Sequence, residues 1–306
     1  MITLLWYILT VLVVVQFVLG SFANGFIVLV NCTDWIKRRK FSLVDQVVTA
    51  LAIFRVSFLW VILINWYSVA SNPALSSLTV FRIIIHISWT VNTHFNTWLA
   101  TSLSILYLLK IANFSSLLFF YLKRRVKSVL LVILVGSLVF LASQLVSVSN
   151  HEIVLSNEKE GNVTWKTKER HLILVSNSAV FLLANLIPFT MSLASLVLLI
   201  HSLRKHLKKR QLSGQGSQDP SARVHIRALQ TMVSFLLLFA IYFFDTLVSF
   251  LNFNKLMNKL VLMFCNALLV LYPSSHSLIL IWGNKKLTRA FLTYLRQLRS
   301  GLRDRE

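Results

Sequence analysis

Long runs of hydrophobic residues, separated by short polar segments, dominate this chain. A helix needs about 20 mostly apolar residues to cross the hydrocarbon core of a membrane. Seven runs reach or approach that length, and the third is polar enough that hydropathy alone identifies it only weakly. We predict membrane-spanning helices at Leu4–Val30, Leu43–Val69, Val80–Leu109, Val129–Val148, Leu172–Leu203, Ala228–Leu251 and Leu260–Trp282.

The polar segments predict how these helices are connected. The longest runs from Arg204 to Arg227 and has a flexible middle at Ser213–Pro220. The fold class that follows is an all-α membrane protein, a seven-transmembrane helix bundle forming one domain at residues 1–284. Residues 285–306 form a separate C-terminal tail.

The tail has a helical pattern of its own. Between Lys286 and Leu302, apolar residues recur on one helical face and arginines flank that face. This spacing is typical of an amphipathic helix lying in the membrane interface, and a disordered basic tail is the alternative. The apolar positions are Leu287, Phe291, Leu295, Leu298 and Leu302.

Composition excludes a soluble protein, because 56% of the residues are hydrophobic and only 13% are charged. A net charge of +21 would suggest nucleic acid as the partner of a soluble chain. Here 23 of the 31 Lys and Arg residues lie in the odd-numbered connections and the tail, and 7 lie in the even-numbered connections or at the start of the third span. The positive-inside rule therefore predicts an outer N-terminus, a cytosolic tail and no nucleic-acid partner.

Arg55 lies near the middle of the second span, where an unpaired cation costs several kcal/mol. It must therefore face the interior of the bundle. We expect it to pin spans one, two and seven together, with Asn24, Ser274, Ser277 or a backbone carbonyl freed by Pro273 as partners. Cys32 and Cys265 fall on opposite sides of the membrane, so no internal disulfide is expected.

A polar and aromatic stripe marks the outer half of the third span. His86, Trp89, Asn92 or Thr93, and Asn96 recur at helical spacing. Such a face lines either a ligand cavity or hydrogen bonds between helices. In favour of a cavity, spans six and seven add Tyr242, Asp245 and Asn266.

Asp245 is open to two interpretations: it binds a ligand amine, or it lies near the outer water. Pro188 and Pro273 kink spans five and seven, as pivots for a switch or as static features. No catalytic constellation, metal-ligand spacing or phosphate loop is present, which predicts neither an enzyme nor a cofactor or metal site. A transporter is the rival class, but no inverted repeat or chain of intramembrane acids supports it.

Several motifs resemble the type 2 (bitter) taste receptors, a family of G-protein-coupled receptors, over essentially the whole chain. They are Phe22-Ala23-Asn24-Gly25-Phe26-Ile27, Leu51-Ala52-Ile53-Phe54-Arg55, Trp98-Leu99-Ala100-Thr101-Ser102-Leu103-Ser104, Tyr107-Leu108-Leu109-Lys110-Ile111-Ala112-Asn113-Phe114-Ser115, Tyr272-Pro273-Ser274, His276-Ser277 and Gly283-Asn284-Lys285-Lys286-Leu287. Two positions depart from the family pattern: Phe54 replaces a common Ser, and Thr93 stands where many members carry a pocket Asn.

The resemblance implies a plasma-membrane receptor that responds to bitter small molecules and signals through a gustducin-type heterotrimeric G protein. It implies roles in ligand sensing for Trp89, Tyr242 and Asn266, and N-glycosylation of Asn162 in the second outer loop. The candidate ligand-binding set is Trp89, Asn92, Thr93, Asn96, Tyr242, Asp245 and Asn266, and the candidate structural or activation set is Asn24, Arg55, Pro188, Pro273, His276 and Ser277. Basic residues expected to face the G protein or anionic lipid are Lys110, Lys123, Arg124, Arg125, Lys205, Lys208 and Lys209.

Overall fold

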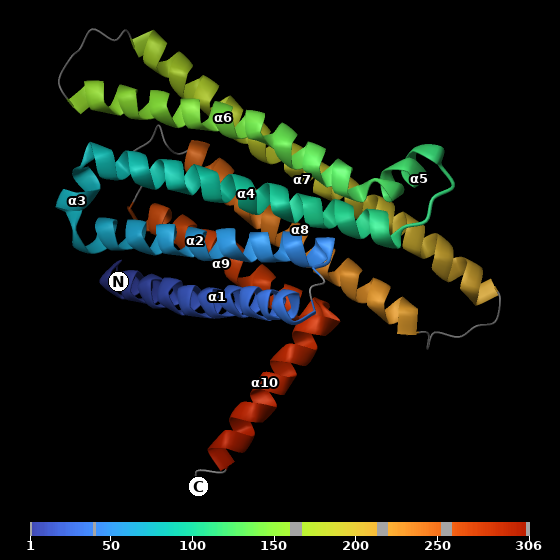
Figure 1. Ribbon diagram of the computed structural model, residues 1–306. Helices are drawn as coiled ribbons and strands as arrows, with labels where there is room; N and C mark the ends of the chain where they lie inside the picture. Colours follow the sequence, from blue (N-terminus) through green and yellow to red (C-terminus); the bar gives the residue numbers. More distant parts are fainter. Residues whose placement is uncertain (1, 39–40, 160–166, 213–219, 252–258, 304–306) are drawn as a thin grey trace.

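Seven long helices run side by side in the computed structural model, which describes residues 2–38, 41–159, 167–212, 220–251 and 259–303 (Figure 1). Within this part of the chain every regular element is helical. The long helices are α1 (Ile2–Arg38), α2 (Leu43–Ser71), α4 (Thr79–Ile111), α6 (Val126–Lys159), α7 (Thr167–Leu212), α8 (Pro220–Leu251) and α9 (Lys259–Gly283). The shorter helices are α3 (Pro73–Ser77), α5 (Leu117–Arg124) and α10 (Lys285–Arg303).

The packing order closes the bundle on itself. α1 packs against α2 and α9, and α8 packs against α9 and α7. α4 contacts α2, α6, α7 and α8, which makes it the most central helix. Its buried residues extend over most of its length, whereas α6 contacts mainly α4 and α7. A polar stripe on α4 therefore faces protein rather than the surroundings of the bundle.

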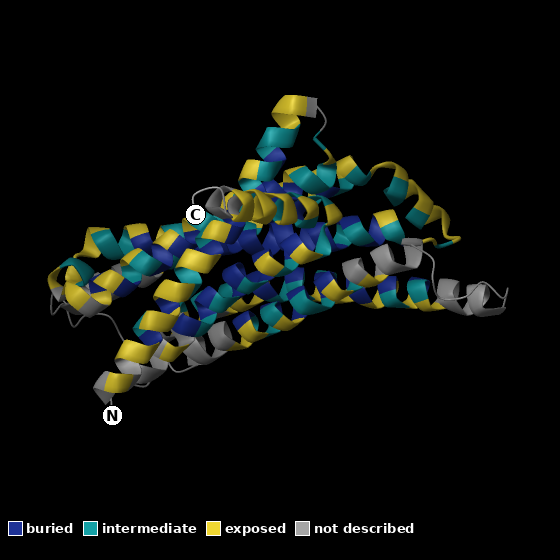
Figure 2. Cartoon of the chain, turned by 90° about the horizontal axis from the view of Figure 1, so that it is seen from below, coloured by how far each residue is buried: buried dark blue, intermediate teal, exposed yellow. Residues whose placement is uncertain are grey.

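Many large hydrophobic side chains are exposed on the long helices, whereas several buried positions are polar. Figure 2 shows how exposed and buried positions alternate along the helices. On α6, Val132 and Val139 are 70% and 71% exposed, whereas Ser137 and Gln144 are buried. Apolar side chains gain by facing outward only where the surroundings are lipid. The chain is an all-α membrane helix bundle, as the sequence predicts.

Four described helical segments are long and apolar enough to cross a membrane, namely Tyr7–Lys37, Leu43–Val69, Val126–Asn150 and Val175–Arg204. Leu229–Phe244 and Ala267–Gly283 are shorter apolar stretches, and α4 is less apolar than the four segments because of its polar stripe. All seven predicted spans coincide with long helices. That each of them crosses the membrane stays a prediction, as does the orientation of the N-terminus.

Several helices extend beyond the hydropathy boundaries. α6 continues to Lys159, and α7 continues to Leu212. The residues of α7 after Leu203 are mostly Lys, Arg, His and Leu, several of them strong helix formers that need no lipid to remain helical. Hydropathy marks where a helix leaves an apolar medium, so the ends that it predicts for such helices come too early in the sequence. Residues 213–219 of the predicted flexible middle lie outside the described residues.

Local signals explain where helices begin. The Ser42 side chain caps α2 by accepting from the Asp45 backbone N–H, and Ser116 caps α5 in the same way at Phe119. Asn72 ends α2 and caps α3, whose first residue is Pro73. The short helices α3 and α5 were not predicted, because hydropathy windows of membrane-span length do not detect helices of one or two turns in connecting segments.

α1 approaches α9 and α2 closely at Gly20. A Cβ added at Gly20 would overlap the Ser274 side chain and lie 2.8 Å from Leu59 Cδ1. Glycine therefore allows α1 to approach α9 and α2 at this level. The Ser274 hydroxyl donates to the Gln16 carbonyl oxygen at 2.9 Å, which adds a polar contact between α1 and α9.

α10 leaves the bundle at a steep angle to the long helices (Figure 1). Its first turns are attached to the bundle: Leu287 is fully buried, and the Phe291 ring packs edge-on against Phe26 with centroids 5.6 Å apart. Further along, Leu292, Tyr294 and Leu295 are exposed. The predicted tail helix is present, and its position in the membrane interface stays a prediction.

Candidate ligand site and polar core

The half of the bundle away from α10 contains the predicted polar stripe of α4. Asn92, Thr93 and Asn96 are all buried, at 5%, 3% and 2% exposure. Trp89 is half-buried and packs edge-on against Phe58 of α2, with ring centroids 5.1 Å apart. These residues form a continuous stretch of α4 that mixes an aromatic ring with amide and hydroxyl groups.

The polar groups of this stretch are incompletely hydrogen-bonded. Asn92 Nδ2 donates to the Ser88 carbonyl oxygen at 2.7 Å, within α4. In the described part of the chain, no partner is found for Asn92 Oδ1, Thr93 Oγ1 or either amide atom of Asn96. Each buried polar atom left without a partner costs about 1–3 kcal/mol. Each such group in a native protein calls for an explanation, such as a functional role, strain, or an ordered water or ion.

The other member of the predicted set that can be placed is Tyr242 on α8. It is buried, and its ring lies near Phe239 of the same helix and Tyr272 of α9, with centroids 6.1 and 5.7 Å away. Phe189 of α7 packs edge-on against Phe239 at 5.4 Å. An aromatic cluster thus joins α7, α8 and α9 inside the bundle. The side chains of Asp245 and Asn266 lie outside the described residues, as does Asn162.

Arg55 is fully buried and is the centre of a network that joins α1, α2 and α9. Its Nη1 donates to Ser277 Oγ at 2.9 Å, and its Nη2 donates to His276 Nδ1. Because a guanidinium can only donate, His276 Nδ1 must accept, which places the imidazole proton on Nε2. The Arg55 guanidinium also lies 5.6 Å from the centroid of the Tyr272 ring, within cation–π range.

The Ser277 hydroxyl connects this arginine to α1. It lies 2.7 Å from Asn24 Oδ1 and 2.8 Å from the Pro273 carbonyl oxygen, either of which can accept its proton. Asn24 Nδ2 in turn donates to the Gly20 carbonyl oxygen at 2.7 Å. Arg55 thus faces the interior of the bundle, and its contacts connect α2 to α9 and, through Ser277, to α1.

Of the partners offered for Arg55, Ser277 bonds to it directly and Asn24 is linked to it through Ser277. Ser274 bonds to the Gln16 carbonyl oxygen of α1 instead. The rotation of α9 brings His276 and Ser277, rather than Ser274, to face α2. Sequence spacing alone did not fix that rotation.

Pro188 of α7 is bonded to α4, a contact that the sequence analysis missed. Thr101 Oγ1 donates to the Pro188 carbonyl oxygen at 3.2 Å and accepts from Ser192 Oγ at 2.9 Å. A second unpredicted contact joins His94 Nε2 to Ser137 Oγ of α6 at 3.2 Å. Buried Ser and Thr residues facing a proline kink could have signalled the first contact, since such side chains commonly bond to backbone near a kink.

The basic residues expected to face a G protein lie toward the α10 end of the bundle. Lys110, Arg124 and Arg125 are exposed, and Lys123 Nζ donates to the Ala112 carbonyl oxygen at 3.0 Å. Both arginines lie 5.4 Å from the centroid of a ring on α5, Phe120 or Tyr121. The side chains of Lys205, Lys208 and Lys209 are outside the described residues.

Comparison with known proteins identifies the family. The family model described as "Taste receptor protein (TAS2R)" matches residues 1–299. The chain is 57% identical over 299 residues to the taste receptor type 2 member 46 of Homo sapiens, covering 98% of this chain and 96% of the relative. The taste receptor type 2 member 31 of Pongo pygmaeus matches with the same identity and coverage.

The chain belongs to the taste receptor type 2 family. The taste receptor type 2 member 31 of Pan troglodytes is 58% identical over 288 residues, 94% of this chain and 93% of the relative. This taste receptor is therefore a G-protein-coupled receptor of the bitter taste class, a membrane protein that binds ligands and couples to a G protein. Its relatives are receptors rather than enzymes.

Proposed function

We propose that this taste receptor binds bitter small molecules in the half of the bundle away from α10, and signals through a gustducin-type heterotrimeric G protein at the plasma membrane. The observation that carries the proposal is the row of buried polar atoms on α4 without partners, at Asn92, Thr93 and Asn96. A ligand that bonds to them offsets a cost that the folded receptor otherwise bears.

The surroundings of that row indicate the chemistry of the ligand. Trp89 supplies an aromatic wall beside Phe58, and Tyr242 belongs to the aromatic cluster of α7, α8 and α9. An amide offers both a donor and an acceptor, and Thr93 offers a hydroxyl. The ligand class is therefore a largely apolar or aromatic molecule with a few hydrogen-bonding groups. Roles for Asp245 and Asn266 at the same site remain part of the proposal.

Ligand binding would act by shifting populations. An agonist that binds one arrangement of α4, α8 and α9 more tightly favours that arrangement. Tyr242 and Tyr272 link α8 to α9 within the aromatic cluster, and Arg55 lies against the Tyr272 ring. This chain of contacts offers a route from the ligand site to the Arg55 network and toward the α10 end.

The charge distribution supports the orientation, with the α10 end in the cytosol and its basic residues near the G protein and anionic lipid. Asn162 would then lie outside and carry a glycan. Asn31, which begins another glycosylation sequon, is 1% exposed and donates to Thr49 Oγ1 at 3.0 Å, so a glycan could not be attached there in the folded state.

The test is calcium mobilisation in cells that express the receptor together with a chimeric gustducin-type G protein, screened with a panel of bitter compounds. We expect a dose-dependent response that disappears when the G protein is omitted. An N-terminal tag on unpermeabilised cells confirms that the receptor is at the surface. If receptor at the surface responds to no compound, the proposal is contradicted.

A further inference from the structure

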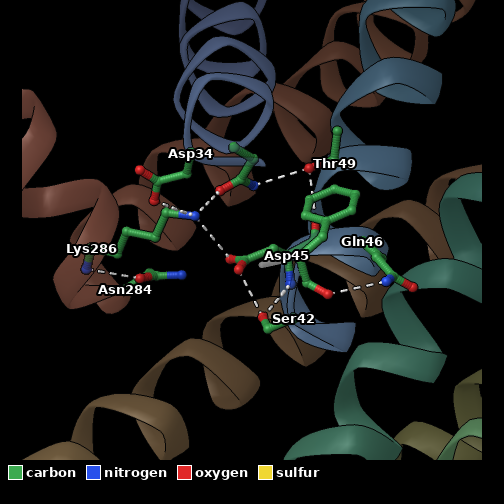
Figure 3. Close-up of polar contacts among 9 residues, drawn as sticks. Asp34, Ser42, Asp45, Gln46, Thr49, Asn284 and Lys286 are labelled. Carbon is green, nitrogen blue, oxygen red and sulfur yellow. Dashed lines mark hydrogen bonds and ion pairs between the residues drawn. The ribbon is translucent and has the colours of Figure 1, made fainter. Parts of the chain in front are cut away.

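A cluster of charged and polar side chains joins α1, α2 and α10 at the end of the bundle where α10 begins (Figure 3). Lys286 Nζ lies 3.0 Å from Asp34 Oδ2, 3.5 Å from Asp45 Oδ1 and 2.9 Å from Asn31 Oδ1. Two carboxylates thus share one ammonium, which leaves these three charges with a net charge of −1. The three residues on Lys286 come from α1 and α2, so the lysine ties the start of α10 to both helices.

Ser42 lies at the edge of this cluster. Its hydroxyl donates to Asp45 Oδ2 at 2.7 Å and accepts from the Asp45 backbone N–H at 3.1 Å (Figure 3). The residue is exposed, and its backbone is extended, with φ −66° and ψ 154°. One serine hydroxyl therefore combines access from solvent with direct contact to a carboxylate that holds Lys286.

Four basic residues precede this serine, and Arg38 and Arg39 are four and three positions before it. Many protein kinases select such serines, because acidic pockets beside their active sites hold arginines that lie a few positions before the acceptor in the sequence. Ser128 also follows arginines and is exposed, but it lies inside α6. Ser116 is exposed and extended but has no arginine among the eight residues before it.

We propose that Ser42 is a phosphorylation site for an arginine-directed serine/threonine kinase, and that its phosphate loosens the attachment of α10 to α2. The proposal rests on the cytosolic orientation proposed above. In the reaction, Ser42 Oγ attacks the γ-phosphorus of ATP and forms an O–P bond. The bond to the β,γ-bridging oxygen breaks, ADP leaves, and the hydroxyl proton passes to the catalytic aspartate of the kinase.

Phosphorylation changes the cluster in a definite direction. The phosphate adds a charge of about −1.5 to −2 at neutral pH and removes the proton that Ser42 donates to Asp45. Repulsion then separates Asp45 from the modified residue, while the phosphate is stabilised by the N-terminus of α2 and competes for Lys286. Both effects weaken the contact between Asp45 and Lys286.

The chemical test uses purified full-length receptor, ATP and the catalytic subunit of an arginine-directed kinase, with mass spectrometry to locate phosphate. We expect phosphate at position 42 in wild type and in Ser42→Thr, none in Ser42→Ala, and at least tenfold slower incorporation in Arg39→Ala. Ser128→Ala is the matched control and should leave position 42 unchanged. Phosphate at other serines but none at Ser42 would overturn the assignment.

The structural consequence is measured by amide hydrogen exchange across residues 285–291 of the same receptor. Phosphorylated wild type and Ser42→Asp should exchange several-fold faster there than unmodified wild type or Ser42→Ala. Lys286→Ala should exchange fast with or without phosphate, and Lys286→Arg should respond like wild type. Equal exchange in phosphorylated and unmodified wild type would refute the proposed loosening of α10.

Intact cells separate this proposal from the proposed function. Phosphate recovered at Ser42 from surface receptor supports both the site and the orientation. If the purified receptor is modified but the cellular receptor is not, after stimulation of arginine-directed kinases, Ser42 is not a cellular site. The position of an N-terminal tag then reports independently whether the orientation itself was wrong.

Discussion

The two halves of the bundle differ in how their buried polar side chains are hydrogen-bonded. Around Arg55, hydrogen bonds cross between helices: the guanidinium bonds to His276 and Ser277, and Ser277 reaches Asn24, while Arg55 Nε and the Tyr272 hydroxyl have no partner among the described residues. Around Asn96, one turn of α4 after Asn92, amide and hydroxyl atoms are buried at similar depth and lack partners in the described chain.

Burial alone therefore does not separate structure from function in this receptor; hydrogen bonds that cross between helices are the better guide. A network of hydrogen bonds between helices holds the helices together in lipid, and loss of that network lowers the stability of the bundle. An unsatisfied group lowers stability in the free receptor and becomes useful only when something binds to it. The two regions should consequently respond to mutation in different measurements.

The largest expected effect is on Arg55. Arg55→Leu removes the cation that bonds to His276 and Ser277, leaving both polar groups buried with fewer partners. We expect a loss of about 3 kcal/mol or more of stability and little receptor at the cell surface. Thermal unfolding of receptor purified in detergent checks this, with the exposed Lys110→Ala as control. An unfolding temperature of Arg55→Leu equal to that of wild type would show that the Arg55 network does not stabilise the bundle.

A smaller effect, seen in function rather than stability, is expected at Trp89. Trp89→Ala removes the aromatic wall beside Phe58, and we expect agonist potency to fall about tenfold to a hundredfold, roughly 1.4–2.8 kcal/mol. Dose–response curves are compared at matched surface expression. Trp35→Ala, at an exposed position near the end of α1, should retain wild-type potency. Equal losses of agonist potency in both variants would show that Trp89 does not belong to the ligand site.

The smallest change in stability, and the one of opposite sign, is expected at Asn96. Asn96→Leu is close in shape and removes two buried atoms that have no partner, so stability should be unchanged or rise by up to about 1 kcal/mol. The matched Asn24→Leu removes a satisfied amide and should destabilise the receptor. Parallel unfolding curves decide the comparison, and destabilisation of the two variants by equal amounts would contradict it.

The fold was largely predictable from the sequence, because lipid allows few solutions. Long apolar runs must be helices, and an arginine within one must face the bundle, as Arg55 does. The sequence could not give the rotation of each helix about its axis. That rotation decides whether Arg55 meets Ser274 or Ser277, and it brings Thr101 to the Pro188 carbonyl.

The cluster around Lys286 was also beyond sequence reasoning. Its members lie in three segments, and a lysine in a basic tail is explained sufficiently by the positive-inside rule. A usable signal did exist, since Asp34 and Asp45 are two of only ten acidic residues and both flank the first basic turn. Acidic residues beside a basic segment indicate that one of the basic residues has a specific ion-pair partner, which the positive-inside rule alone does not explain.

The most direct test of the central account is a structure of the receptor bound to an agonist and its G protein, with the agonist taken from the calcium screen. The account predicts ligand density against Trp89, with hydrogen bonds to Thr93 or Asn96, and an intact Arg55–Ser277 contact. Ligand density elsewhere, with the Asn96 amide bonded only to neighbouring helices, would contradict the assignment of the unsatisfied half of the bundle to ligand binding.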